Sequence, residues 1–206
     1  MTIIKLDDSL LVGEGLTRSC YRHPSKEWLC VKVEKERYHN VTLREISFLK
    51  RFERRGISWD MVSEYYGRID TDKGTGYMFR LIRDEDGSVS KTLGHYLSHE
   101  ADHVDYDKMR DAFFAFRHFL IMQRIQVFSL LDYNVVYQKV SSSDHRIVPI
   151  DSVGNNQFLP VADYIGFFAR RVIRRKWYTF EKRLMRDYGG NTRLVSIIED
   201  LRRHPC

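Results

Sequence analysis

The sequence predicts an α+β fold in two lobes: a small antiparallel β lobe with one helix, followed by a shortened, mainly helical lobe. The first third of the chain carries short apolar or alternating runs separated by turn residues, which is typical of antiparallel strands. The last two thirds repeat apolar side chains every three or four residues, which is typical of helices. Residues 83–88 are charged and rich in turn-forming residues, so they divide the chain into lobes of residues 1–83 and 84–206.

The first lobe is expected to contain five strands and one helix. Three strands form a meander, and the other two form a hairpin around the turn Asp72-Lys73-Gly74. The helix lies between the third and fourth strands and ends at Gly56. Thr42 is suited to cap its first turn, with Glu45 as the capping-box partner three residues later. The expected strands cover residues 10–12, 19–22, 28–33, 63–70 and 76–82.

The second lobe is expected to contain helices at about residues 92–98 and 106–123, a β-hairpin that turns at residues 141–144, and a long basic helix near the C-terminus. The apolar residues that the basic helix would turn toward the core are Ile165, Phe167, Phe168, Val172, Ile173, Trp177, Phe180 and Leu184. Because these residues recur at near-helical spacing, an amphipathic helix is predicted there.

Composition limits the classes of protein to which the chain can belong. With 206 residues and 43% apolar side chains, the chain can bury a sizeable core. Its apolar runs are too short to cross a membrane, since a span needs about 20 apolar residues. Asp7 and Asp8 stand where a signal peptide would be apolar, so a cytoplasmic protein is expected. The three cysteines lack CxxC spacing, which argues against a disulfide framework and a structural zinc site.

Three fragments of the first lobe suit phosphate binding in combination. In Gly13-Glu14-Gly15, between two expected strands, the missing Cβ atoms let a ligand approach the backbone, and the nearby guanidinium of Arg18 could itself meet phosphate. Lys32 alternates with two valines on a strand, so its side chain lies on the face opposite theirs. A buried lysine needs an anionic partner, and Glu45 is the natural one. Glu45 thus has two interpretations, capping residue and ion-pair partner.

A second set of polar residues flanks the hairpin of the second lobe. Asn134 precedes its first strand, and Asp151 follows its second strand in the sequence Asp151-Ser152-Val153-Gly154. An amide and a carboxylate oxygen that converge in this way suit a hard cation such as Mg²⁺. A polar hairpin end would explain either residue alone.

Taken together, the order of these fragments resembles that of protein kinases. A glycine-rich turn, a strand lysine, a helical glutamate, an asparagine and an aspartate hold ATP and Mg²⁺ in those enzymes. The resemblance implies a protein-kinase-like fold with ATP in a cleft between the lobes. It implies Asn134 and Asp151 as metal ligands, and the candidate catalytic residues are Asn134 and, for the reason given below, Asp132. The expected nucleotide-binding residues are Gly13, Gly15, Arg18, Lys32, Glu45 and Leu81.

From Leu11 to about Ala169 the chain also resembles the YrbL family, bacterial proteins associated with the PhoP regulatory network and similar to protein kinases in fold. The resemblance lies in five short motifs. They are Gly13-x-Gly15-x-x-Arg18-x-Cys20-Tyr21, Arg44-Glu45, Gly74-Thr75-Gly76-Tyr77, Ser129-Leu130 ahead of Asn134-Val135, and Pro149-x-Asp151-x-x-Gly154.

The chain departs from the kinase pattern at the catalytic base, because Ser129 stands where a kinase carries its aspartate. Asp132, three residues later, could replace that base if the loop is reshaped. Three classes of function stay open. The first is an atypical phosphotransferase that acts on an unknown acceptor, and the second is a pseudokinase adaptor that works through its basic C-terminal helix. The third is a binder of anionic lipid or polysaccharide without nucleotide.

The formal charge of +6 is concentrated near the C-terminus. Its cations there are Arg170, Arg171, Arg174, Arg175, Lys176, Lys182, Arg183 and Arg186. A solvated helix face is one interpretation. If the face has a partner, an anionic membrane or a lipopolysaccharide-related surface fits better than sequence-specific nucleic acid, since the sequence contains no recognisable nucleic-acid-binding module.

Overall fold

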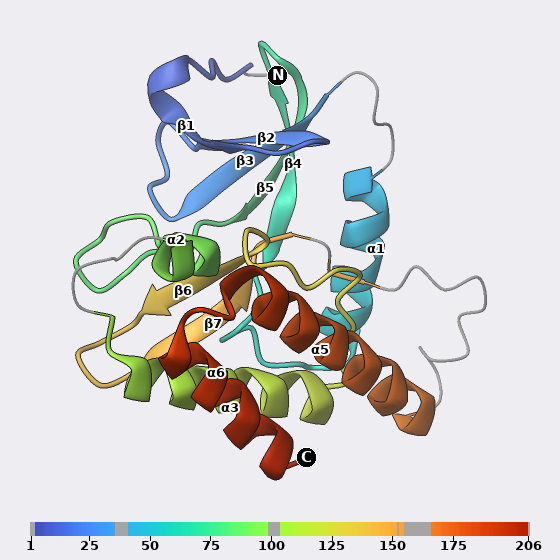
Figure 1. The fold of residues 1–206 in the computed structure, drawn as a ribbon. Coiled ribbons are helices and arrows are strands. Elements are labelled where there is room, and N and C mark those ends of the chain that lie inside the picture. Colours follow the sequence, from blue (N-terminus) through green and yellow to red (C-terminus); the bar gives the residue numbers. More distant parts are fainter. Residues whose placement is uncertain (1–2, 36–40, 99–103, 152, 155–165, 206) are drawn as a thin grey trace. The chain divides into compact units, whose positions relative to one another are not determined.

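The fold of the chain is shown in Figure 1 as a computed structural model. The structure describes residues 3–35, 41–98, 104–151, 153–154 and 166–205. The chain forms two compact units: Met1–Trp59 with Ser63–Arg83, called the β unit below, and Asp60–Val62 with Asp84–Cys206, called the helical unit. The main boundary falls between Arg83 and Asp84, within the charged segment. The mixed α and β content predicted from the sequence is confirmed.

A five-stranded antiparallel sheet forms the centre of the β unit, with the strand order β1-β2-β3-β5-β4. The strands are β1 (Leu11–Glu14), β2 (Arg18–Arg22), β3 (Leu29–Glu34), β4 (Tyr65–Thr71) and β5 (Gly74–Arg80), and a short 3-10 helix, η1 (Asp8–Leu10), precedes them. The predicted meander and hairpin are confirmed, with boundaries shifted by one or two residues. Gly74 begins β5 with a φ of 101°, a conformation that favours glycine.

The two faces of β3 differ in chemistry, as its alternating sequence predicts. Val31 and Val33 pack with Leu6 and Tyr21 in a buried apolar cluster on one face of the sheet. Lys32 lies between the two valines in sequence, so its side chain points to the other face. The alternation therefore places this lysine on the face away from the apolar cluster.

Gly76 of β5 is required by the packing of that cluster. A Cβ atom at this position would lie 2.5 Å from Cγ1 of Val31 and 3.0 Å from Cγ2 of Thr71. Gly76→Ala is therefore expected to lower the free energy of unfolding by about 1–3 kcal/mol, the usual cost of overpacking. Urea denaturation measures this loss. Gly13→Ala is the matched control, because an added Cβ there meets no described atom within 4 Å, and an equal loss in both variants would contradict the packing argument.

Helix α1 (Val41–Arg54) follows β3 in the β unit. Gly56 ends it, with a φ of 62° that favours glycine, as predicted. The capping-box interpretation is wrong, however. The helix begins at Val41, so Thr42 lies inside its first turn, and the backbone N–H of Thr42 donates to the Glu34 carboxylate. A neighbouring strand thus supplies the acceptor, which local sequence spacing does not reveal.

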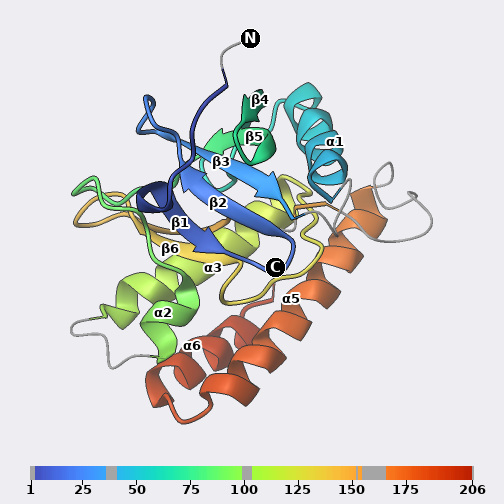
Figure 2. The same ribbon diagram turned by 90° about the horizontal axis from the view of Figure 1, so that it is seen from above.

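In its described residues the helical unit combines four helices with a β-hairpin, and helices α3, α5 and α6 lie side by side in Figures 1 and 2. Its elements are α2 (Leu93–Ser98), α3 (Tyr106–Met122), β6 (Val135–Lys139), β7 (His145–Pro149), α5 (Gly166–Tyr188) and α6 (Thr192–Arg203). Aromatic side chains fill the space between α3 and α5. Phe113 stacks on Phe180 with ring centroids 6.2 Å apart, and Phe116 meets Trp177 edge-on at 5.8 Å.

Of the apolar residues predicted to face inward from α5, four are buried, Val172 is half-buried and one is exposed. Ile173, Trp177, Phe180 and Leu184 are buried, whereas Phe168 is 45% exposed. The predictions for Ile165 and Phe167 lie outside the described side chains. Among the described residues, no helix has both the length and the apolar composition needed to cross a membrane.

Arg117 of α3 fixes the C-terminal end of α6. It is 6% exposed, and its guanidinium donates to the carbonyl oxygens of Leu201 at 2.6 Å and His204 at 2.5 Å. Carbonyls at a helix C-terminus lack partners within the helix, so a cation there satisfies them and suits the helix dipole. In the sequence Arg117 only interrupts an apolar run, but in the structure it anchors the end of α6.

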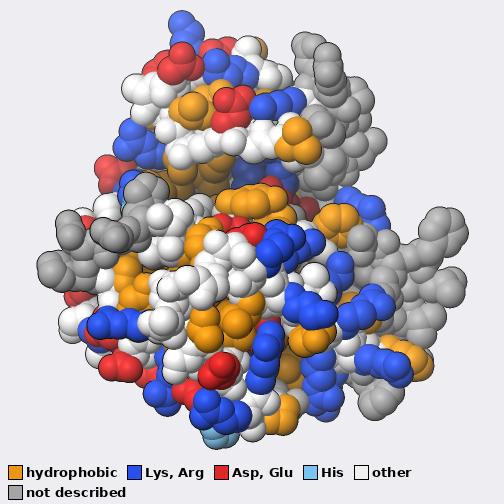
Figure 3. Space-filling view, viewed as in Figure 1, with side chains coloured by type: hydrophobic (Ala, Val, Ile, Leu, Met, Phe, Trp, Pro, Cys, Tyr) orange, Lys and Arg blue, Asp and Glu red, His pale blue; other side chains and the backbone are white. Residues whose placement is uncertain are grey.

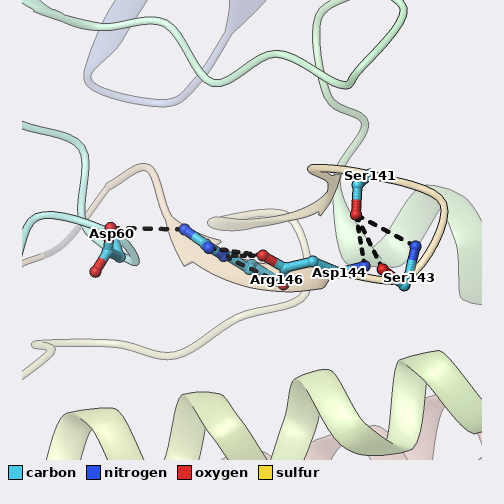
Figure 4. Close-up of polar contacts among 5 residues, drawn as sticks. All are labelled: Asp60, Ser141, Ser143, Asp144 and Arg146. Atoms are coloured by element: carbon cyan, nitrogen blue, oxygen red, sulfur yellow. Dashed lines mark hydrogen bonds and ion pairs between the residues drawn. The ribbon is translucent and has the colours of Figure 1, made fainter.

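The hairpin of the helical unit also holds the short segment Asp60–Val62. In Figure 4, Arg146 lies between two carboxylates, that of Asp144 at 2.6 Å and that of Asp60 at 3.6 Å. The predicted turn at residues 141–144 is confirmed. Its backbone N–H groups at Ser143 and Asp144 donate to the hydroxyl of Ser141.

Candidate functional site

The glycine-rich turn joins β1 to β2. Gly13 pairs with Cys20 within the sheet, and the backbone N–H of Gly15 donates to the carbonyl of Arg18 at 2.8 Å. Neither glycine has a positive φ, and a Cβ on Gly15 would make only ordinary contact at 3.5 Å with the carbonyl oxygen of Arg18. Backbone conformation and packing in the described residues therefore leave both glycines unexplained.

The strand register places Gly13 and Lys32 in one row across the sheet. Gly13 lies opposite Cys20, and Cys20 lies opposite Lys32 on β3. Adjacent strands are about 4.8 Å apart, so the two backbones are separated by about 10 Å. The turn and the lysine therefore lie two strands apart in this row.

Lys32 is buried on this face. Its side chain is 6% exposed, and its Nζ atom lies 4.2 Å from the ring centroid of Phe79. Burial lowers the pKa of Lys32 below its ordinary value of 10.5, while the charge of Glu45 opposes that shift and the charge of Arg18 adds to it. The charge of Glu45 thus acts on this lysine, while a direct ion pair between Lys32 and Glu45 stays a prediction.

Glu45 also forms a buried ion pair that the sequence does not predict. Nη1 of Arg18 lies 2.6 Å from the Glu45 carboxylate, and the two side chains are 5% and 7% exposed. The same nitrogen donates to the Thr42 hydroxyl at 3.2 Å. Arg18 therefore ties β2 to α1 and holds Glu45 in place. Its contact with phosphate stays a prediction.

Leu81, the last residue of the predicted nucleotide-binding set, lies just after β5. It is 8% exposed, and its backbone N–H donates to the carbonyl of Trp28 at 2.8 Å. It belongs to the β unit, together with the turn, Lys32 and Glu45.

In the helical unit, the hairpin brings Asn134 and Asp151 to the same end, as predicted. The backbone N–H of Ile150 donates to the carbonyl of Asn134 at 3.0 Å, so Asp151 comes directly after a residue paired with Asn134. Beyond Asp151, Val153 pairs with Val127, and Gly154 has a φ of 133° that favours glycine. Two oxygen-bearing side chains thus start from neighbouring backbone positions.

The loop before Asn134 is held by basic residues of α5. Nη1 of Arg183 lies 3.4 Å from both the Ser129 hydroxyl and the Leu130 carbonyl, and Nζ of Lys176 donates to the Phe128 carbonyl at 2.7 Å. Burial lowers the pKa of Lys176, and the charges of Arg175 and Arg183 lower it further. Ser129, which the sequence comparison with kinases predicts in place of the catalytic base, thus has a guanidinium beside it.

Asp132 is engaged in a structural contact. The hydroxyl of Tyr188, at the end of α5, donates to its carboxylate at 2.5 Å, and burial together with this hydrogen bond raises the pKa of Tyr188. The backbone N–H of Gly94 donates to the Asp132 carbonyl at 3.1 Å, and a Cβ on Gly94 would collide with its carboxylate. Asp132 therefore joins its loop to α2 and α5.

The sequence assigns Lys176 and Arg183 only to a basic surface and gives no role to Tyr188. Lys176 and Arg183 are seven residues apart on one helix, so they share a face, and this spacing was available as a signal. Tyr188 contacts a residue 56 positions away, and no local pattern indicates that contact.

Within the described residues, no cluster of three His, Cys, Asp or Glu side chains is arranged to hold a metal ion. A metal at Asn134 and Asp151 would need ligands from water or from the nucleotide as well.

Comparison with known proteins identifies relatives across most of the chain. A sequence profile of the family described as "PhoP regulatory network protein YrbL" matches residues 4–185. Proteins described as "Uncharacterized protein YrbL" from Escherichia coli (strain K12) and Shigella flexneri are each 28% identical to it over 184 residues. In both cases the match covers 86% of this chain and 86% of the relative.

Proposed function

The chain belongs to the family described as PhoP regulatory network protein YrbL, and we propose that it is a kinase-like protein that binds ATP together with Mg²⁺. The observation that carries the proposal is the row formed by Gly13, Cys20 and Lys32 in the sheet. Two glycines with no conformational or packing requirement lie at the turn beside a buried lysine. Close approach by a phosphate chain explains all three residues at once.

In this proposal the helical unit supplies the metal ligands. Asn134 and Asp151 carry neutral and anionic oxygen donors at one end of the hairpin, and such donors suit Mg²⁺. When bound, Mg²⁺ would offset the charge of the phosphate oxygens. The ion pair of Glu45 with Arg18 would fix the position of α1 against the sheet and so the electrostatic environment of Lys32. One nucleotide would then engage residues of both units.

Thermal unfolding with and without ATP and Mg²⁺ tests this proposal. A ligand present at about 100 times its dissociation constant stabilises the folded state by roughly 2.7 kcal/mol. We expect a shift of the unfolding midpoint that requires ATP and Mg²⁺ together. The absence of any shift at millimolar ATP would refute the proposal and leave the nucleotide-free alternative.

The glycine-rich turn gives a second test. Gly13→Ala is expected to leave stability unchanged or to raise it by about 0.4–1 kcal/mol, because the added Cβ meets open space and the unfolded chain loses freedom. The same methyl group would occupy the space that the phosphates need, so ATP affinity should fall about tenfold or more. Gly76→Ala should show the opposite pattern, with lower stability and unchanged ATP affinity. Equal ATP affinity in wild type and Gly13→Ala would contradict the role of the turn.

Bound nucleotide could serve two functions, a phosphotransferase reaction on an unknown acceptor or a pseudokinase-like regulatory role with a protein partner. Phosphoryl transfer depends chiefly on positioning and charge, so the reaction is compatible with a serine at position 129. Asp132 is then the candidate base. The hydrogen bond from Tyr188 to Asp132 and the guanidinium of Arg183 at Ser129 favour the regulatory role. Incubation with radiolabelled ATP and cell extract separates the two. Label transfer that survives Tyr188→Phe but not Asp132→Asn would establish the enzyme, whereas binding without transfer would establish the regulator.

A further inference from the structure

Helix α5 carries an excess of positive charge on its outer face that the proposed nucleotide site does not use. It contains eight lysine and arginine residues and two acids, Glu181 and Asp187. Glu181 is 4% exposed, accepts from the indole of Trp177 at 2.7 Å and pairs with Arg202 at 3.0 Å. Asp187 pairs with the neighbouring Arg186 at the C-terminal end. The solvent-facing side chains of α5 before that end are therefore free of negative charge.

Six exposed residues of α5 form one line along the helix, which we call the basic stripe. Successive members are three or four residues apart, so they lie on a single face, opposite the buried Ile173, Trp177 and Leu184. Figure 3 shows lysine and arginine side chains gathered over α5, with apolar side chains among them. The stripe consists of Phe168, Arg171, Arg175, Tyr178, Lys182 and Arg186.

Two aromatic side chains interrupt the cations of the stripe and face solvent. Phe168 is 45% exposed and Tyr178 is 51% exposed. Nζ of Lys182 lies 4.7 Å from the Tyr178 ring centroid, and the guanidinium of Arg202 on α6 lies 6.0 Å from it. A face whose only task is solvation does not need exposed aromatic rings, whereas a membrane interface attracts both cations and aromatic rings.

The geometry of the stripe favours a bilayer surface over a nucleic acid. From Phe168 to Arg186 it extends about 27 Å along the outside of a single helix, at 1.5 Å per residue. An extended flat partner can contact such a line over its whole length. Proteins that bind single strands instead bring cations and stacking rings together in a groove. The phenyl ring of Phe168 lacks polar atoms and suits the boundary between head groups and acyl chains.

We propose that the basic stripe of α5 docks the protein on a bilayer that contains anionic lipids. Arg171, Arg175, Lys182 and Arg186 would contact lipid phosphates, while Phe168 and Tyr178 would enter the head-group region. Attraction to an anionic surface adds with each cation and is screened by salt. The docking depends on the outer face of α5 alone, so it stands or falls separately from nucleotide binding.

Vesicle flotation of the full-length chain tests the proposal. The probes are vesicles of phosphatidylcholine alone and of phosphatidylcholine mixed with phosphatidylglycerol. Wild type is expected to float with the mixed vesicles and not with the neutral ones, and added salt should weaken this binding. Charge reversal by Arg171→Glu, Arg175→Glu and Lys182→Glu together should lower affinity roughly 100-fold or more, because each lost cation costs roughly a factor of five and each new acid adds repulsion.

The matched control reverses three exposed cations outside α5, namely Lys5→Glu, Lys26→Glu and Lys91→Glu. This variant has the same net charge as the stripe variant and should still float with anionic vesicles. A third variant, Phe168→Ser with Tyr178→Ser, should lose the part of the binding that persists in high salt. Circular dichroism and the unfolding midpoint check that each variant is folded.

Three outcomes would overturn the proposal. Wild type could fail to bind anionic vesicles, or the control variant could lose binding as much as the stripe variant does. The chain could instead bind single-stranded RNA or heparin through the stripe residues while ignoring vesicles, which would assign the stripe to a soluble polyanion.

Discussion

Glu45→Gln is expected to lower the free energy of unfolding by about 3–5 kcal/mol, the usual result of removing one partner of a buried ion pair. The substitution keeps the shape of the side chain and removes its charge. Arg18 and Lys32, which are 5% and 6% exposed, then both lose the negative charge of Glu45. Urea denaturation at neutral pH measures the loss.

Glu53→Gln is the matched control for this variant. Glu53 lies on the same helix and is exposed, so the same chemical change there should stay within about 0.5 kcal/mol. The double variant Arg18→Met with Glu45→Met should recover much of the lost stability, because it leaves fewer uncompensated charges in the interior. Equal effects of Glu45→Gln and Glu53→Gln would contradict the importance of the buried pair.

Asp151→Asn is expected to remove most of the stabilisation that ATP provides in the presence of Mg²⁺, about 2.7 kcal/mol at 100 times the dissociation constant. The change removes the anionic oxygen that a hard cation prefers and keeps the size of the side chain. Differential scanning fluorimetry with ATP, with and without Mg²⁺, measures the effect.

Asp144→Asn provides the comparison at the opposite end of the same hairpin. Asp144 pairs with Arg146, so this variant is expected to lose a little stability and to keep the full response to ATP and Mg²⁺. If Asp151→Asn retains the Mg²⁺-dependent shift of wild type, Asp151 is not a metal ligand.

The sequence predicts those parts of the site that depend on strand alternation and short connections. Alternation along β3 places Lys32 opposite the two valines, and the hairpin brings Asn134 next to the strand that leads to Asp151. Both features follow from local geometry, in which side chains alternate and paired strands end together. Both features can therefore be predicted without knowledge of tertiary contacts.

Other parts depend on how distant elements dock, and sequence patterns do not encode that directly. The guanidinium of Arg18 meets Glu45 because α1 packs against β2, and the sequence does not indicate this contact. Phe168 fits the apolar period of α5 and yet faces solvent, because the helix presents Ala169 and Ile173 to the core instead. Asp132 is joined to Tyr188 across 56 residues. In each case tertiary contacts decide between alternatives that the sequence leaves equal.

The most direct measurement of the central claim is a calorimetric titration of ATP and Mg²⁺ into wild type and Lys32→Met, combined with the unfolding free energy of each protein. Burial lowers the pKa of Lys32 below 10.5, so the unfolded chain holds this proton more tightly than the folded one. The charged lysine therefore costs stability at neutral pH, and this cost declines as pH rises through the interval between the two pKa values. The Lys32→Met variant has no charge at this position and therefore avoids this cost in stability.

We expect wild type to bind ATP, and Lys32→Met to lose that binding while its unfolding free energy stays the same or rises. Undetectable binding in wild type, or a parallel loss of stability and binding in Lys32→Met, would show that this lysine is a structural residue and would contradict the account.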